Sequence, residues 1–173
     1  MTWKYKQKDN EVTDSIGLLI SILVRYPEVG TINYDPRTQV LKFTFIFSTK
    51  LDEKEINNFN KLILEGIETY NLLEGKKATK TEVHFQFCDN FTLLEICRDV
   101  NTLTKEELSL IVELVHDYFS QDLITETNDY IMEEDLLMQE ELIEHMLENL
   151  KTSTQEKNLI AFREDGRVLV FNK

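Results

Sequence analysis

Alternation of apolar and polar residues, the pattern of a half-buried strand, is clearest in residues 38–47. Four apolar residues share one face of this segment: Leu41, Phe43, Phe45 and Phe47. Residues 29–34 predict a partner strand, because the link between the two begins with Asp35-Pro36, which favours a type I turn. The first part of the chain therefore predicts a β-hairpin.

The same alternation predicts two further hairpins. Residues 81–88 and 91–98 flank the turn sequence Asp89-Asn90, and residues 158–173 alternate about Asp165-Gly166. An Asp-Gly pair between two alternating runs is a strong signal for a two-residue turn. Three hairpins are thus expected along the chain.

Helical periodicity separates these hairpins. The expected helices cover about 13–25, 52–73, 103–119 and 128–150. The second and third open with the same pattern, a hydrophobic staple and a capping box, in Leu51–Ile56 and Leu103–Leu108. Gly75 is expected to end the second helix. The repeated helix–hairpin order is a weak indication of internal duplication.

This order predicts an α+β fold with a mainly antiparallel sheet built from helix–hairpin units. The simplest topology is a permuted ferredoxin-like arrangement with the helices on one face. A long acidic C-terminal helix and a terminal β-hairpin complete the chain. We expect a flexible N-terminus at residues 1–10, an α+β core at 11–120, and a segment 121–173 packed on the same domain or on a second subunit.

The excess of acidic residues is confined to one segment of the chain. The net charge is −13, yet the 45 residues between Lys105 and Lys151 contain fourteen acids and no lysine or arginine. The rest of the chain carries a net charge of +1. Nucleic-acid binding is therefore not expected, because phosphate contacts need clustered basic residues.

The two cysteines and the absence of a long apolar run indicate the cellular compartment in which the protein is expected. Cys88 and Cys97 would lie at opposite ends of one strand, too far apart for a disulfide, and free thiols suit a reducing cytosol. The longest apolar run, residues 16–24, is far shorter than the ~20 residues that a membrane-spanning helix needs. We expect a cytoplasmic protein without a membrane segment.

The acidic helix divides into two faces at 100° per residue. Its apolar side forms an arc of about 180° that includes Met138 and Leu142. Such a wide arc suggests contact with more than one element or with a second copy. The candidate interaction residues lie mostly on the other side: Glu133, Leu137, Glu140, Glu144 and Glu148. Repulsion along the glutamate row totals only about 1 kcal/mol, so this row needs no ligand to be tolerated.

A metal site is the competing interpretation. Glu141 and His145 are four residues apart on one helical face, and His116 with Asp117 on the preceding helix could supply further ligands. The residue three before His145 is Leu142, so this histidine lacks the Glu-x-x-His spacing of di-iron bundles, and neither His-Glu-x-x-His, G-x-S-x-G nor a phosphate loop is present. No cofactor is predicted.

The sequence therefore favours a non-enzymatic interaction or regulatory module. Its acidic helix would face solvent or a basic protein partner, and the chain would form a homodimer or larger homo-oligomer. The alternative is a metal-dependent enzyme that uses the carboxylates and histidines of the two C-terminal helices.

Overall fold

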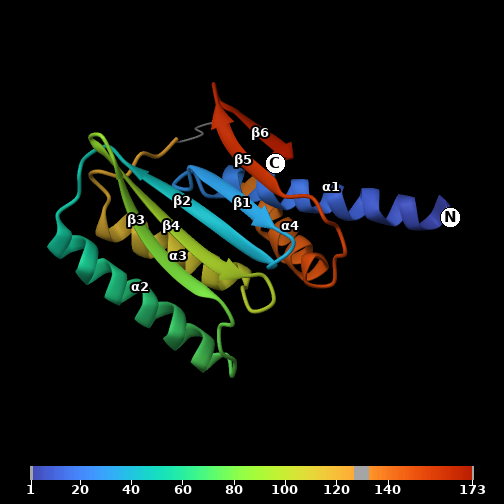
Figure 1. The fold of residues 1–173 in the computed structure, drawn as a ribbon, viewed down its shortest axis with the longest axis horizontal. Coiled ribbons are helices and arrows are strands. Elements are labelled where there is room, and N and C mark those ends of the chain that lie inside the picture. Colours follow the sequence, from blue (N-terminus) through green and yellow to red (C-terminus); the bar gives the residue numbers. More distant parts are fainter. Residues whose placement is uncertain (1, 127–132, 173) are drawn as a thin grey trace.

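A six-stranded antiparallel sheet with the strand order β3-β4-β2-β1-β5-β6 forms the centre of the molecule (Figure 1). The computed structural model describes the backbone of residues 2–126 and 133–172, and the side chains from residue 10 onward within these ranges. The strands are β1 (Thr31–Asp35), β2 (Val40–Phe47), β3 (Thr81–Cys88), β4 (Phe91–Asp99), β5 (Leu159–Glu164) and β6 (Arg167–Asn172).

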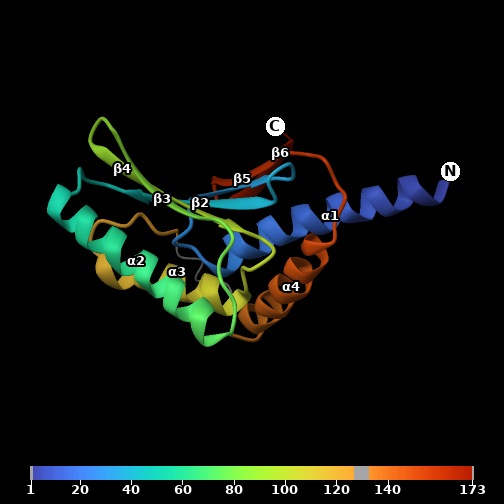
Figure 2. The same cartoon turned by 60° about the horizontal axis from the view of Figure 1, so that its bottom comes forward.

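The helices cover one face of this sheet and leave the other face open (Figure 2). They are α1 (Thr2–Arg25), α2 (Glu53–Leu73), α3 (Lys105–Tyr118) and α4 (Glu133–Lys151). Among the described residues, no helix is both long enough and apolar enough to cross a membrane. The predicted α+β class, with helices on one face of an antiparallel sheet, is confirmed.

Each of the three predicted hairpins follows a helix, giving the units α1-β1-β2, α2-β3-β4 and α4-β5-β6. The first two units pair through β2 and β4, so β1 to β4 form the antiparallel sheet expected of the permuted ferredoxin-like arrangement. The third unit extends this sheet, because β5 pairs with β1. The terminal hairpin therefore lies in the same sheet as the rest of the chain.

The core lies between the sheet and the helices. On β2 the four apolar residues of the alternating pattern are fully buried: Leu41, Phe43, Phe45 and Phe47. Burial of a side chain of this size stabilises the fold by about 1.5–3 kcal/mol. The polar residues between them face the open side of the sheet, where Lys42 lies beside Cys97 of β4.

The ends of α2 follow the predicted signals. Asp52 is the N-cap and accepts a hydrogen bond from the Lys54 N–H. At the other end, Gly75 has a φ of +72°, a left-handed conformation that favours glycine. The N–H groups of Gly75 and Lys76 donate to the carbonyls of Leu72 and Asn71, which is the Schellman pattern.

The N-terminal segment differs from the prediction. The chain is helical from Thr2, whereas a loose segment was expected up to residue 10 and a helix only from Thr13. In both views α1 extends well beyond the sheet (Figures 1 and 2). The C-terminal end of α1 is fixed by Arg163 of β5, whose guanidinium donates to the carbonyls of Leu23, Tyr26 and Val29.

Candidate interaction surface and sheet cleft

Helix α4 packs against α1 along a narrower face than its sequence suggested. Its buried residues are Ile143, Met146, Leu147 and Leu150. Met138 and Leu142, which were expected in the apolar arc, are 60% and 41% exposed. The buried face is thus narrower than the apolar arc of the sequence, although α4 does contact two elements, α1 and α3. The predicted start of this helix at Asn128 lies outside the described residues.

The glutamate row of α4 has basic partners within the chain. Arg25 Nη2 lies 2.7 Å from Glu140 Oε1, and Lys151 Nζ lies 2.7 Å from Glu148 Oε1. Lys105 Nζ lies 3.9 Å from Glu144 Oε2. The last two glutamates are mostly exposed, so these pairs contribute at most about 1 kcal/mol each. The row is nevertheless largely neutralised by bases from outside the acidic segment.

A second set of acids on α4 has no such partner in the described part of the chain. Glu133, Glu134, Asp135 and Glu141 are exposed and form no ion pair there. Leu137, which is 59% exposed, and the two exposed residues Met138 and Leu142 lie on the same exposed half of the helix. We call this set the outer face of α4: Glu133, Glu134, Leu137, Met138, Glu141 and Leu142. It combines apolar side chains with carboxylates that are free to meet cations.

The metal candidates are not gathered into a cluster. His116 Nδ1 lies 3.8 Å from Glu28 Oε1, whereas His145 Nε2 lies 3.4 Å from the side-chain amide of Asn149. Asp117 and Glu141 are exposed. Within residues 10–126 and 133–172, no group of three or more His, Cys, Asp or Glu side chains is arranged to hold a metal ion.

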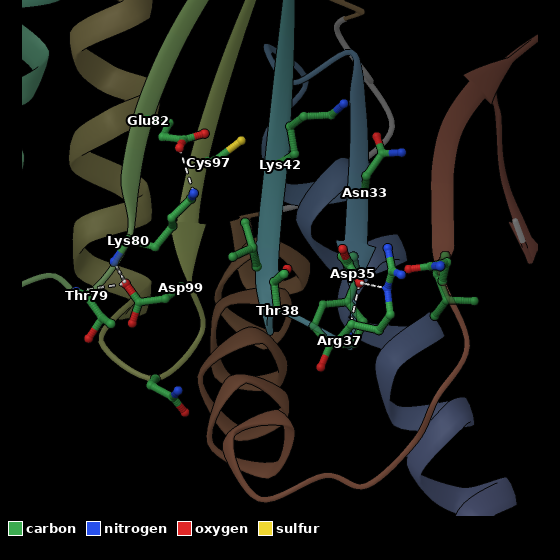
Figure 3. Close-up of a pocket in the computed structure, with 15 residues that line it drawn as sticks. Asn33, Asp35, Arg37, Thr38, Lys42, Thr79, Lys80, Glu82, Cys97 and Asp99 are labelled. Carbon is green, nitrogen blue, oxygen red and sulfur yellow. Dashed lines mark hydrogen bonds and ion pairs between the residues drawn. The ribbon is translucent and has the colours of Figure 1, made fainter.

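The open face of the sheet carries a polar cleft of about 870 Å³ (Figure 3). Its lining includes three cations and three carboxylates: Arg37, Lys42, Lys80, Asp35, Glu82 and Asp99. Lys80 and Glu82 point toward each other, with 2.6 Å between Nζ and Oε1. Cys97 lies in the floor of the cleft, and burial raises the pKa of its thiol, which favours the unreactive protonated form. The cleft is large enough for a small molecule, but its paired charges do not specify one.

A buried ionic cluster lies beside this cleft, at the end of β4. Arg98 is fully buried, and its guanidinium donates to Glu107 at 2.5 Å from Nε to Oε2 and 2.8 Å from Nη2 to Oε1. Arg98 Nη1 also donates to Asp99 Oδ1 at 2.5 Å. Asn71 donates its side-chain N–H to Glu107 Oε1 at 2.7 Å. The cluster joins the sheet to α2 and α3.

Asp99 is held ionised within this cluster. Burial alone would raise the pKa of its carboxyl, but hydrogen bonds from the Lys80 N–H and from Thr102, together with the charge of Arg98, outweigh burial and lower the pKa. Arg98 likewise keeps its charge, because its bonds to Glu107 oppose the effect of burial and raise its pKa.

Sequence reasoning missed this cluster. Arg98 is in phase with Leu94 and Ile96 on the face of β4 that points to the core, and a charged residue in that position requires a buried partner. Glu107 was interpreted as the carboxylate of a capping box. The N-cap part of that prediction is correct, since Thr104 Oγ1 accepts from the Glu107 N–H at 3.1 Å. The carboxylate itself bonds to Arg98.

Comparison of this chain with protein-family models, with curated proteins and with solved structures gives no match. The function proposed below is therefore argued from the contacts and charges of the chain itself.

Proposed function

We propose that this protein is a non-enzymatic interaction module that binds a basic segment of a protein partner through the outer face of α4. The observation that carries the proposal is the exposure of Leu137 and Met138, 59% and 60%, among carboxylates without a counterion in the described chain. Both ingredients occur on the exposed half of α4, which also carries the paired residues Glu144 and Glu148.

The exposed apolar residues are stronger evidence for a binding partner than the acids are. Glu133 and Glu134 are in the first turn of α4, where carboxylates stabilise any helix by interacting with its dipole. Their presence alone would therefore need no partner. Glu141 lies two turns further on, where this effect has faded, and its neighbours Leu137 and Leu142 gain nothing from exposure to water.

These features define the chemistry of the partner. It should present one or two apolar side chains to Leu137 and Met138, with lysines or arginines at their flanks to meet the carboxylates. Electrostatic attraction of this kind speeds association and weakens as salt is added. The same arrangement does not require a cofactor or a catalytic group.

Two triple variants with equal changes of charge test the proposal. Glu133→Gln, Glu134→Gln and Glu141→Gln remove three of the four unpaired acids of α4 and leave Asp135, whereas Glu140→Gln, Glu144→Gln and Glu148→Gln remove the paired row. Immobilised wild-type protein is used to capture partners, which are identified by mass spectrometry, expressed in pure form and titrated against each variant.

We expect a partner whose affinity falls at least tenfold with the first triple variant and with Leu137→Asp, and much less with the second triple variant. The affinity should also fall with rising salt concentration. Equal loss with the two triple variants would show that only total charge matters. No loss with Leu137→Asp would refute docking on this face.

A further inference from the structure

Strand β6 forms one edge of the sheet, and its outward hydrogen-bonding groups can be assigned. The turn at Asp165 and Gly166 has two residues with positive φ, 51° and 74°, and pairs Glu164 with Arg167. In such a hairpin the residues that flank the turn exchange hydrogen bonds, and every second pair does so after that. The N–H and C=O groups of Val168, Val170 and Asn172 therefore point away from β5.

This edge lacks the features that usually prevent strand addition. Within the described residues no strand pairs with the outer side of β6. Its sequence from 168 to 172 contains no charge and no proline, which are the common means of blocking an edge. The other edge strand, β3, carries Glu82 and His84 on its open face. Strand β6 is thus the edge better suited to pairing.

We propose that β6 pairs in antiparallel orientation with β6 of a second copy of this chain, about a two-fold axis at Val170. In this register Val170 faces its counterpart and Val168 faces Asn172 of the other copy. All three outward residues then form hydrogen-bonded pairs, which supply about six backbone hydrogen bonds. The two sheets become one continuous sheet across the axis.

The side chains of β6 favour its own copy as the partner. Phe171 is 52% exposed and stacks on Phe162 with 5.5 Å between ring centroids. The proposed register places Leu169 of each copy opposite Phe171 of the other on the open face, so both apolar side chains lose exposure. No like charges meet between residues 168 and 172, and one position further out Arg167 of each copy faces the position of Lys173, which lies outside the described residues.

Helix α1 provides a second argument. It extends past the β6 edge in both views (Figures 1 and 2), and β6 packs on it from above. A second copy related by the two-fold axis would bring its own α1 alongside in antiparallel orientation, beneath the joined sheet. The projecting helix would then lie against protein rather than in solvent.

Proline substitutions give the first test, by sedimentation velocity over a range of concentrations. Val170→Pro removes an outward N–H, which an edge strand tolerates, so the folded monomer should persist while the dimer is lost. The matched variant Leu169→Pro removes an N–H that bonds to β5 and should lower the melting temperature. A wild-type protein that stays monomeric, or a dimer that Val170→Pro leaves intact, would overturn the proposal.

Disulfide trapping tests the register and remains decisive if Val170→Pro fails to fold. In a background with Cys88→Ser and Cys97→Ser, an equal mixture of Leu169→Cys and Phe171→Cys chains should cross-link on oxidation. Non-hydrogen-bonded pairs such as this one bring Cα atoms to about 4.5 Å, within disulfide range. Either variant alone should cross-link much less. Equal cross-linking in all three samples would refute the register.

This inference is independent of the proposed function. The dimer joins two chains of net charge −13, so it should strengthen with added salt, whereas binding of a basic partner to α4 should weaken. Val170→Pro should leave partner binding intact, and Leu137→Asp should leave the dimer intact.

Discussion

Replacement of Arg98 by methionine should destabilise the protein far more than loss of any surface ion pair. The guanidinium is fully buried and satisfies Glu107 through two hydrogen bonds of 2.5 and 2.8 Å. Arg98→Met leaves the buried carboxylate of Glu107 without its cation. Removal of one partner from a buried pair of this kind costs about 3–5 kcal/mol, compared with at most about 1 kcal/mol for an exposed pair.

The double variant Arg98→Met, Glu107→Leu should recover much of this loss. It replaces both charges by apolar side chains of similar length, and such replacement of a buried pair is often close to neutral. Asp99 keeps hydrogen bonds from the N–H groups of Thr79, Lys80 and Thr102. Asn71 keeps its bond to the Ile67 carbonyl. Asn71 loses its bond to Glu107, and its Oδ1 has no hydrogen-bond partner among the described residues, so we expect the recovery to be incomplete.

Urea unfolding followed by far-ultraviolet circular dichroism measures these differences. With a slope of about 2 kcal/mol per molar urea, a loss of about 4 kcal/mol lowers the midpoint by about 2 M. The double-variant cycle then gives the coupling between Arg98 and Glu107. A loss below about 1 kcal/mol for Arg98→Met, or a double variant as unstable as the sum of the single ones, would refute this account of the cluster.

Three further predictions concern single groups. The pKa of the Asp99 carboxyl is lower in the folded protein than in the unfolded chain, where it is near 4. Its contribution to stability is therefore fully present above about pH 4 and is lost as the pH falls through the folded pKa. Asp99→Asn should flatten the decrease in unfolding free energy at acid pH. Burial, with the adjacent charge of Asp35, raises the pKa of Tyr34 to about 12. In an ultraviolet titration, Tyr34→Phe should therefore remove an absorbance step near pH 12 and leave the curve near pH 10 unchanged. Arg163→Met should lower the free energy of unfolding by about 1–3 kcal/mol, because three carbonyls at the end of α1 lose their hydrogen-bond donor. The rate of amide hydrogen exchange should also rise more in residues 20–26 than in α3.

Much of the fold could be predicted because local signals and burial agree. The alternation of β2, the turn at Asp165-Gly166 and the glycine that ends α2 each determine their own conformation, so their elements are confirmed. The N-terminus could not be predicted in this way. Residues 1–10 lack a helical apolar stripe, and their polar character was interpreted as a loose segment, whereas α1 begins at Thr2.

The buried cluster shows a different limit of sequence reasoning. Arg98 and Glu107 are close in the sequence, but their contact depends on the turn between β4 and α3. A capping box explains Glu107 without any tertiary contact, so the local interpretation appeared complete. The signal that could have corrected it was the charged residue in phase with Leu94 and Ile96 on the core face of β4. A buried cation in that position requires a carboxylate nearby.

The count of acids in residues 106–150 overstates the negative charge that α4 offers to a partner. The segment contains no lysine or arginine, yet Arg25, Lys105 and Lys151 from outside it lie beside Glu140, Glu144 and Glu148. A charge pattern along the sequence cannot show such pairing, because the partner bases belong to other elements. What remains on α4 after folding is the smaller set Glu133, Glu134, Asp135 and Glu141, which lie beside exposed apolar side chains. The case for a partner therefore rests on that mixture of carboxylates and apolar groups, and not on the net charge of the helix.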